Sequence, residues 1–137
     1  MKTLKLTIAV LALLFVGVTA NAAKKATTKT DVVNIYIDAI ANGKVKGLDN
    51  VLDDQMQFCT QRGANVNTIS KDKFLDYLGK GTDTTAPLNT STTIMQDDDN
   101  SQKVKIDFKY DGYVRTDVVT LSHTTGWVIT NVTSSYQ

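Results

Sequence analysis

A long series of strand-like segments in the last fifty residues constrains the fold of this chain most strongly. From residue 88 to residue 137, apolar and polar side chains alternate with the period of two that marks a half-buried β-strand. The clearest segment places on one face Val104, Ile106, Phe108 and Tyr110, and on the other Lys103, Lys105, Asp107 and Lys109. Turn-forming residues at 97–100, 111–112 and 123–126 separate the segments. The pattern predicts four antiparallel strands joined as a meander.

The first half of the chain has helical spacing instead. Thr30 or Asp31 can cap a helix that Gly43 would end, since glycine readily adopts the left-handed conformation of a helix C-cap. The apolar stripe of that helix, with steps of three and four, comprises Val32, Val33, Tyr36, Ile37 and Ile40. A shorter helix is predicted around Leu48, Val51 and Leu52. A third helix would start after Ser70 and bury Phe74, Leu75 and Leu78.

Between the second and third helices the period changes to two. Residues 55–61 read as a strand, 62–65 as a turn and 66–69 as a short returning strand. The apolar face of a meander must be covered, and the early helices are the available cover. The sequence therefore predicts an α+β fold in which a curved antiparallel sheet wraps around about three N-terminal helices.

Residues 1–22 are typical of a signal peptide. Lys2 and Lys5 precede an apolar run at 6–18, and Ala20-Asn21-Ala22 has the small residues of a cleavage site. The run is shorter than the roughly 20 residues that span a bilayer, although a membrane anchor is the alternative interpretation. We therefore expect export to the periplasm or the medium. Residues 23–30 would then be a flexible leader, and 31–137 a single domain.

Composition excludes several classes of protein. The net charge of +1, which cleavage would lower to −1, gives no positive footprint for nucleic acid. The single Cys59 and the single His123 exclude cysteine-based zinc sites and multi-histidine metal centres. We expect no metal, no cofactor and no membrane association after cleavage. Cys59 is interpreted as a small buried hydrophobe, with an intermolecular disulfide as the alternative.

The element order resembles the nuclear transport factor 2-like superfamily, whose members have a cone-shaped, cystatin-like α+β roll. The segment 36–43 is similar to the first helix of that superfamily, which typically carries a tyrosine and ends in a glycine turn. The segments 117–121 and 126–132 are similar to its closing hairpin, with Gly-Trp-x-Ile at the turn. The chain is most similar to small exported bacterial members of the SnoaL-like and lumazine-binding types. This resemblance implies a pocket between helices and sheet, but no particular activity.

Six residues are candidates for the lining of such a pocket: Tyr36, Met56, Phe58, Phe108, Tyr110 and Trp127. Most aromatic and apolar residues of this kind belong to the packed core, and Tyr36 also has a core interpretation with a satisfied hydroxyl. Asp38 lies on another side of the helix from Tyr36, so the two are not expected to act together.

Charged residues give weaker candidates. His123 falls in a turn, where a solvated imidazole is expected and a catalytic one is not. Arg115 and Asp117 are neighbours on one strand face and are interpreted as a surface or cross-strand charge pair, or else as an anchor for an anionic ligand. The acidic run 97–100 is interpreted as a hairpin turn and not as a calcium loop, since it lacks the EF-hand spacing.

Two functions remain open at this point. The first is an exported, non-catalytic module that binds a small apolar or aromatic ligand or another protein, and that forms a homodimer through the sheet. The second is an isomerase, dehydratase or cyclase that uses Tyr36 with a carboxylate, Asp76 or Asp117. Convergence of Tyr36 and an aspartate on one enclosed cavity would favour the enzyme. A filled or wholly apolar cavity would favour the binding module, and no catalytic residue is assigned.

Overall fold

A computed structural model describes residues 28–81 and 85–137, and the segment expected to be a signal peptide lies outside them. The described residues form three helices and six strands. Their order is α2 (Lys29–Asn42), α3 (Leu48–Val51), β1 (Leu52–Arg62), β2 (Asn65–Ser70), α4 (Lys71–Gly79), β3 (Asn89–Asp97), β4 (Ser101–Tyr110), β5 (Tyr113–His123) and β6 (Trp127–Tyr136). The α+β class and the order of elements are those predicted from the sequence patterns.

The six strands form one sheet in the order β2-β1-β6-β5-β4-β3. The last four strands are the predicted antiparallel meander, and β1 and β2 form the predicted hairpin. The expectation of a purely antiparallel sheet was wrong at one junction, because β1 pairs with β6 in parallel. The connection from the hairpin to the meander runs through α4, which lets the chain cross to the far edge of the sheet before it returns.

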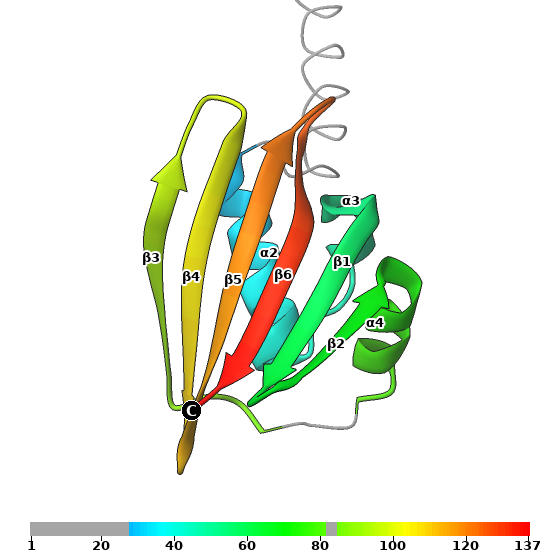
Figure 1. The fold of residues 1–137 in the computed structure, drawn as a ribbon. Helices are drawn as coiled ribbons and strands as arrows, with labels where there is room; N and C mark the ends of the chain where they lie inside the picture. The colour runs from blue at the N-terminus through cyan, green and yellow to red at the C-terminus, as the bar shows by residue number, and fades with distance from the viewer. Residues whose placement is uncertain (1–27, 82–84) are drawn as a thin grey trace, which may run out of the picture.

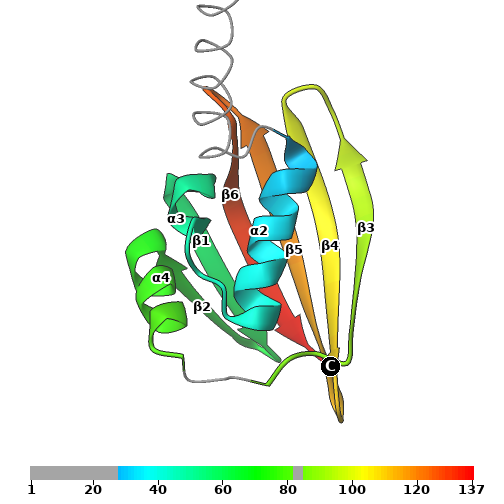
Figure 2. The ribbon, with the colours of Figure 1, turned by 180° about the vertical axis from the view of Figure 1, so that it is seen from behind.

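All three helices lie on one face of the sheet (Figures 1 and 2). Helix α4 packs on β1 and β2, whereas α2 and α3 pack on β6. The core between these layers is continuous, and the alternation in β4 is as predicted, with Val104, Ile106 and Phe108 fully or almost fully buried. Edge strand β3 has no buried residue, and its Ile94 is 60% exposed.

Helix α2 begins slightly earlier than the sequence suggested. Thr28 is the N-cap residue, and its hydroxyl accepts a hydrogen bond from the backbone N–H of Asp31 at 3.1 Å. The helix ends as predicted at Gly43, whose φ of 68° favours glycine. In α4 the prediction is confirmed at Ser70, which caps the helix through the N–H of Lys73. Both helix N-termini are therefore fixed by local side-chain chemistry.

The face of the sheet opposite the helices carries Thr, Ser and Lys side chains, most of them half-buried by their neighbours. Cys59 lies there, between Thr68 of β2 and Thr133 of β6. It is half-buried and not a fully buried hydrophobe as expected, because odd-numbered positions of β1 at this point face away from the helices. The homodimer expected through this face stays a prediction.

Among the described residues, no helix is both long and apolar enough to cross a membrane.

Candidate functional site

A buried network connects the middle of α2 to β5. The hydroxyl of Tyr36 donates a hydrogen bond to Oδ2 of Asp117 at 2.6 Å, and both side chains are completely inaccessible to solvent. Tyr36 reaches the sheet because it lies on the apolar stripe of α2, one turn after Val32 and Val33. Burial, and then the charge of Asp117, raise the pKa of Tyr36 well above its usual value. The phenol is therefore held as a neutral hydrogen-bond donor.

Arg115 completes this network from the same strand as Asp117. Its Nε and Nη2 donate to Oδ1 and Oδ2 of Asp117, each at 2.9 Å, which is a bidentate pair. The guanidinium carbon lies 5.8 Å from the ring centroids of both Phe58 and Phe108. Burial alone would lower the pKa of Arg115, but the Asp117 carboxylate outweighs it and the net shift is upward. The arginine is permanently charged.

The prediction of a surface charge pair was wrong. Asp117 continues the inward series that Val119 and Leu121 form along β5, so it faces the helices. This signal was present in the sequence. Asp117, Val119 and Leu121 occupy every second position after Arg115, and every second residue of a strand lies on the same face. The assumption that paired charges are exposed concealed it, although a buried charge is tolerated when it is paired and hydrogen-bonded.

A groove of about 350 Å³ opens beside Arg115, on the helix side of the sheet. Its lining comes from β1, β2, α4, β5 and β6, and consists of Phe58, Thr60, Arg62, Asn65, Val66, Asn67, Ile69, Tyr77, Arg115 and Tyr136. Half of these ten residues are aromatic or aliphatic, and the other half are one threonine, two asparagines and two arginines. The volume lies at the lower end of the range for small-molecule sites, which begins at about 300 Å³.

The charged side chains that line the groove are all positive. Arg62 and Arg115 are the only arginines in the whole chain, and both line it, whereas no carboxylate does. The guanidinium of Arg62 lies over the ring of Tyr136, 4.9 Å from its centroid. Within residues 28–81 and 85–137, Arg62 forms no ion pair. The groove thus combines apolar walls with one uncompensated cation and one paired cation.

Of the six sequence-selected pocket candidates, Phe58 lines this groove. Tyr36, Met56 and Phe108 are fully buried core residues, with at most 1% of each exposed. Tyr110 stacks on Tyr113 with ring centroids 4.8 Å apart. Trp127 is only partly buried, and its ring contacts His123 and the ammonium of Lys29. Arg115 was named from the sequence as a possible anchor for an anionic ligand. The remaining groove residues were not found, because the lining extends along the chain from Phe58 to Tyr136 and most of them lie at polar or exposed positions.

The structure distinguishes between the two aspartates proposed as partners of Tyr36. Asp117 is its partner, whereas Asp76 is exposed on α4 and pairs with Lys80 at 3.1 Å. His123 is exposed, as predicted, but it is the last residue of β5 and precedes the turn. Neither Tyr36 nor Asp117 lines the groove. Tyr36 and Asp117 therefore converge, but within packed core and not on a cavity.

A second hollow, of about 330 Å³, lies on the opposite face of the sheet near Lys105, Asp107 and Lys109. Its acidic group is already occupied, since Asp107 accepts a hydrogen bond from Thr116 at 2.6 Å and pairs with Lys105 at 3.6 Å. No group of metal-ligating side chains occurs among the described residues. About half of the wall of this hollow is apolar, a smaller share than in the groove beside Arg115.

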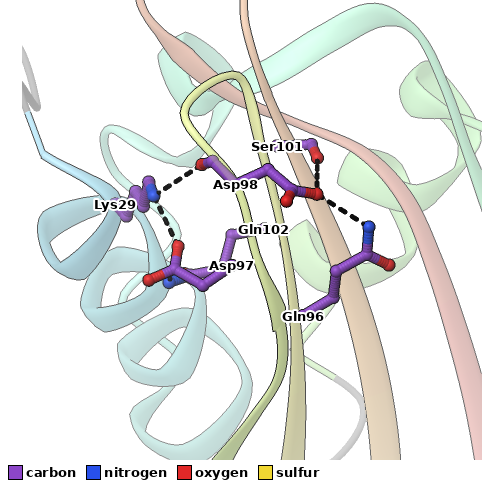
Figure 3. Close-up of polar contacts among 6 residues, drawn as sticks. All are labelled: Lys29, Gln96, Asp97, Asp98, Ser101 and Gln102. Carbon is purple, nitrogen blue, oxygen red and sulfur yellow. Dashed lines mark hydrogen bonds and ion pairs between the residues drawn. The ribbon is translucent and has the colours of Figure 1, made fainter.

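The acidic run at 97–100 forms the β3–β4 hairpin turn (Figure 3). Lys29 of α2 donates to the Asp97 carboxylate and, at 3.0 Å, to the backbone carbonyl of Asp98. The Asp98 carboxylate accepts hydrogen bonds from Gln96 and Ser101. The carboxylates of Asp97 and Asp98 are thus bound by the chain's own donors, which is consistent with a polar hairpin turn.

Comparison with solved structures identifies the fold. The chain is similar to an NTF2-like protein of unknown function from Shewanella baltica OS155, with 12% identity, a TM-score of 0.62, and 79% of this chain and 90% of that chain covered. An NTF2-like protein of unknown function in nutrient uptake from Rhodospirillum rubrum matches with 18% identity, a TM-score of 0.62, and coverage of 79% and 97%. A DUF4783 family protein from Bacteroides ovatus matches with 13% identity, a TM-score of 0.58, and coverage of 74% and 91%.

These similarities establish an NTF2-like α+β fold, which the sequence resemblance had predicted. They go no further than the fold, because the identities are low and these NTF2-like neighbours are themselves of unknown function. No family model matches the sequence, and no curated protein matches it. The function must therefore be argued from the groove and the network beside it.

Proposed function

We propose that this chain is an exported, non-catalytic binding protein that holds a small apolar or aromatic molecule in the groove beside Arg115. One observation carries the proposal: a groove of about 350 Å³ whose exposed wall is more apolar than polar, on the helix side of an NTF2-like sheet. Apolar walls with a few convergent polar groups are the usual composition of a small-molecule site. Export rests on the composition of residues 1–22.

The catalytic alternative has one observation in its favour, the contact between Tyr36 and Asp117. General acid–base catalysis needs a group within hydrogen-bond reach of the substrate. Both side chains are fully buried, and Arg115 stands between them and the groove. The raised pKa of Tyr36 also opposes its ionisation. These contacts support a structural role for the pair and a binding role for the groove.

The proposal can be tested with a neutral fluorescent probe, N-phenyl-1-naphthylamine, and two matched variants. Tyr77 and Ile94 are 52% and 60% exposed, but only Tyr77 lines the groove. We expect Tyr77→Asp to weaken probe binding at least about fivefold, because it removes an aromatic wall and a carboxylate must then lose water beside the ligand. Ile94→Asp should leave the affinity unchanged.

Equal effects of the two substitutions would place the probe elsewhere and contradict the proposal. Absence of probe binding by the wild-type protein would also contradict it. If the probe binds as expected, mass spectrometry of small molecules that co-purify with the natively exported protein would identify the natural ligand.

A further inference from the structure

We propose that the groove selects a carboxylate attached to a flat apolar body, with Arg62 and Arg115 as the two groups that recognise the acid. This inference rests on the proposed function and narrows its ligand class. It follows from how the arginines are distributed, how Arg115 is held, and which charges are missing from the walls.

The distribution of cations is the first argument. The chain has 15 basic residues, of which only Arg62 and Arg115 are arginine, and these two come from β1 and β5 to line one groove. No lysine lines it. Arginine presents planar, forked N–H donors that match both oxygens of a carboxylate, whereas lysine is a point charge. The groove is thus the place where the chain offers geometry suited to a carboxylate.

The second argument is the state of Arg115. A guanidinium has five N–H donors, and Asp117 accepts from two nitrogens of this one. Apart from the Tyr36 hydroxyl, which also interacts with this guanidinium, no second acceptor from the described residues is hydrogen-bonded to it. The side chain is 12% exposed and lines the groove, so solvent or a ligand reaches it from there. Arg115 can therefore donate to a ligand without giving up Asp117.

The network behind Arg115 fixes its direction. Asp117 holds two of its nitrogens, and Tyr36 in turn holds Asp117. Because all three side chains are in packed surroundings, little rotamer freedom remains to be lost when a ligand binds. Tyr36 and Asp117 are positioning residues in this scheme, and they do not touch the ligand.

The net positive charge of the groove comes from Arg62. Asp117 offsets the charge of Arg115, but no carboxylate lines the groove and none pairs with Arg62 among the described residues. The guanidinium of Arg62 lies on Tyr136, which limits its positions. The apolar part of the ligand would meet Phe58, Ile69 and Tyr77, which favour a flat ring system.

Three probes with one ring system separate charge from shape: 2-naphthoate, 2-naphthamide and 2-naphthylmethylammonium. Binding to the wild-type protein is measured by isothermal titration at low ionic strength. We expect 2-naphthoate to bind at least about tenfold more tightly than the amide, and the ammonium compound to bind most weakly. Arg62→Gln should reduce 2-naphthoate affinity at least about fivefold and change that of the amide less than about twofold. Arg62 is exposed, so this substitution leaves the fold intact.

Lys73→Gln is the matched control. Lys73 is exposed on α4 outside the groove, so the variant loses the same charge without losing a groove contact. If Lys73→Gln lowered the affinity for 2-naphthoate as much as Arg62→Gln, the preference for the acid would come from the overall charge of the protein and not from the groove. That result would overturn the inference. Equal affinities for the acid and the amide, both lost in Tyr77→Asp, would overturn it and leave the binding function standing. Failure of all three probes and of the neutral naphthylamine would overturn both.

Discussion

Helix α2 is attached to the sheet by two aspartate contacts with opposite surroundings. At its N-terminus, Lys29 pairs with Asp97 in the β3–β4 turn, where the Asp97 side chain is 51% exposed (Figure 3). In its middle, Tyr36 bonds to Asp117, which is completely buried and also holds Arg115. Both contacts join the same helix to residues far away in the sequence.

The difference lies in what replaces the contact when it breaks. Water solvates Lys29 and Asp97 at once, so their pairing adds little to stability. Water cannot reach Asp117, so loss of one member of the network leaves its former partner desolvated with a missing contact. The exposed contact is therefore replaceable, whereas the buried one determines whether α2 and β5 can pack together.

The largest effect is expected for Asp117→Ala. This substitution leaves the guanidinium of Arg115 buried without its carboxylate, and it removes the acceptor of Tyr36. We expect the free energy of unfolding to fall by about 3–5 kcal/mol, measured by urea denaturation. The double variant Asp117→Leu with Arg115→Met should recover much of that loss, because apolar side chains can replace a buried pair. A loss below about 1 kcal/mol in the single variant would contradict the assignment of a buried pair.

Tyr36→Phe should have a smaller effect. It removes one hydrogen bond to a charged acceptor, but Arg115 continues to hold Asp117, so we expect a loss of about 2 kcal/mol. The pKa of Tyr36 is raised by burial and by Asp117, so its contribution is complete below the unfolded-state pKa of about 10 and declines as the pH rises further. Urea denaturation at pH 8 and at pH 11 should therefore show a smaller alkaline loss in the variant than in the wild type. Equal losses would mean that the phenol ionises freely.

The smallest effect is expected for Lys29→Gln. The pair is open to solvent, so the urea midpoint should fall slightly at low salt and should match the wild type at high ionic strength. The hydrogen bond from Lys29 lowers the pKa of Asp97, so any contribution is present above the unfolded-state value of about 4 and disappears as the pH falls through the folded-state pKa. A drop that persists in high salt would show that the contact between Lys29 and the ring of Trp127 matters more than the ion pair.

Local patterns made the element order predictable. Periodicity and capping act over a few residues, and so Ser70, Gly43 and the alternation in β4 could be interpreted directly from the sequence. The parallel contact between β1 and β6 could not be predicted in this way, because it joins Leu52 to Ile129 and depends on how the whole sheet is assembled. No short-range signal specifies such a partner.

The candidate site shows the same limit more sharply. Asp117 could have been placed inward from its alternation with Val119 and Leu121, and that signal went unused. The groove gave no such signal, since its lining extends from Phe58 to Tyr136 and draws one or a few residues from each of five elements. Only the assembled fold brings Arg62 and Arg115 to one surface.

The parallel pairing of β1 with β6 affects how the chain must be made. Strand β6 lies between β1 and β5, so the β1–β2 hairpin has no link through the sheet to β3, β4 and β5 until residues 127–136 take their place. A chain that emerges from the ribosome N-terminus first can therefore complete this sheet only after residues 127–136 have been made, so the place of its β1–β2 hairpin depends on a late, long-range pairing.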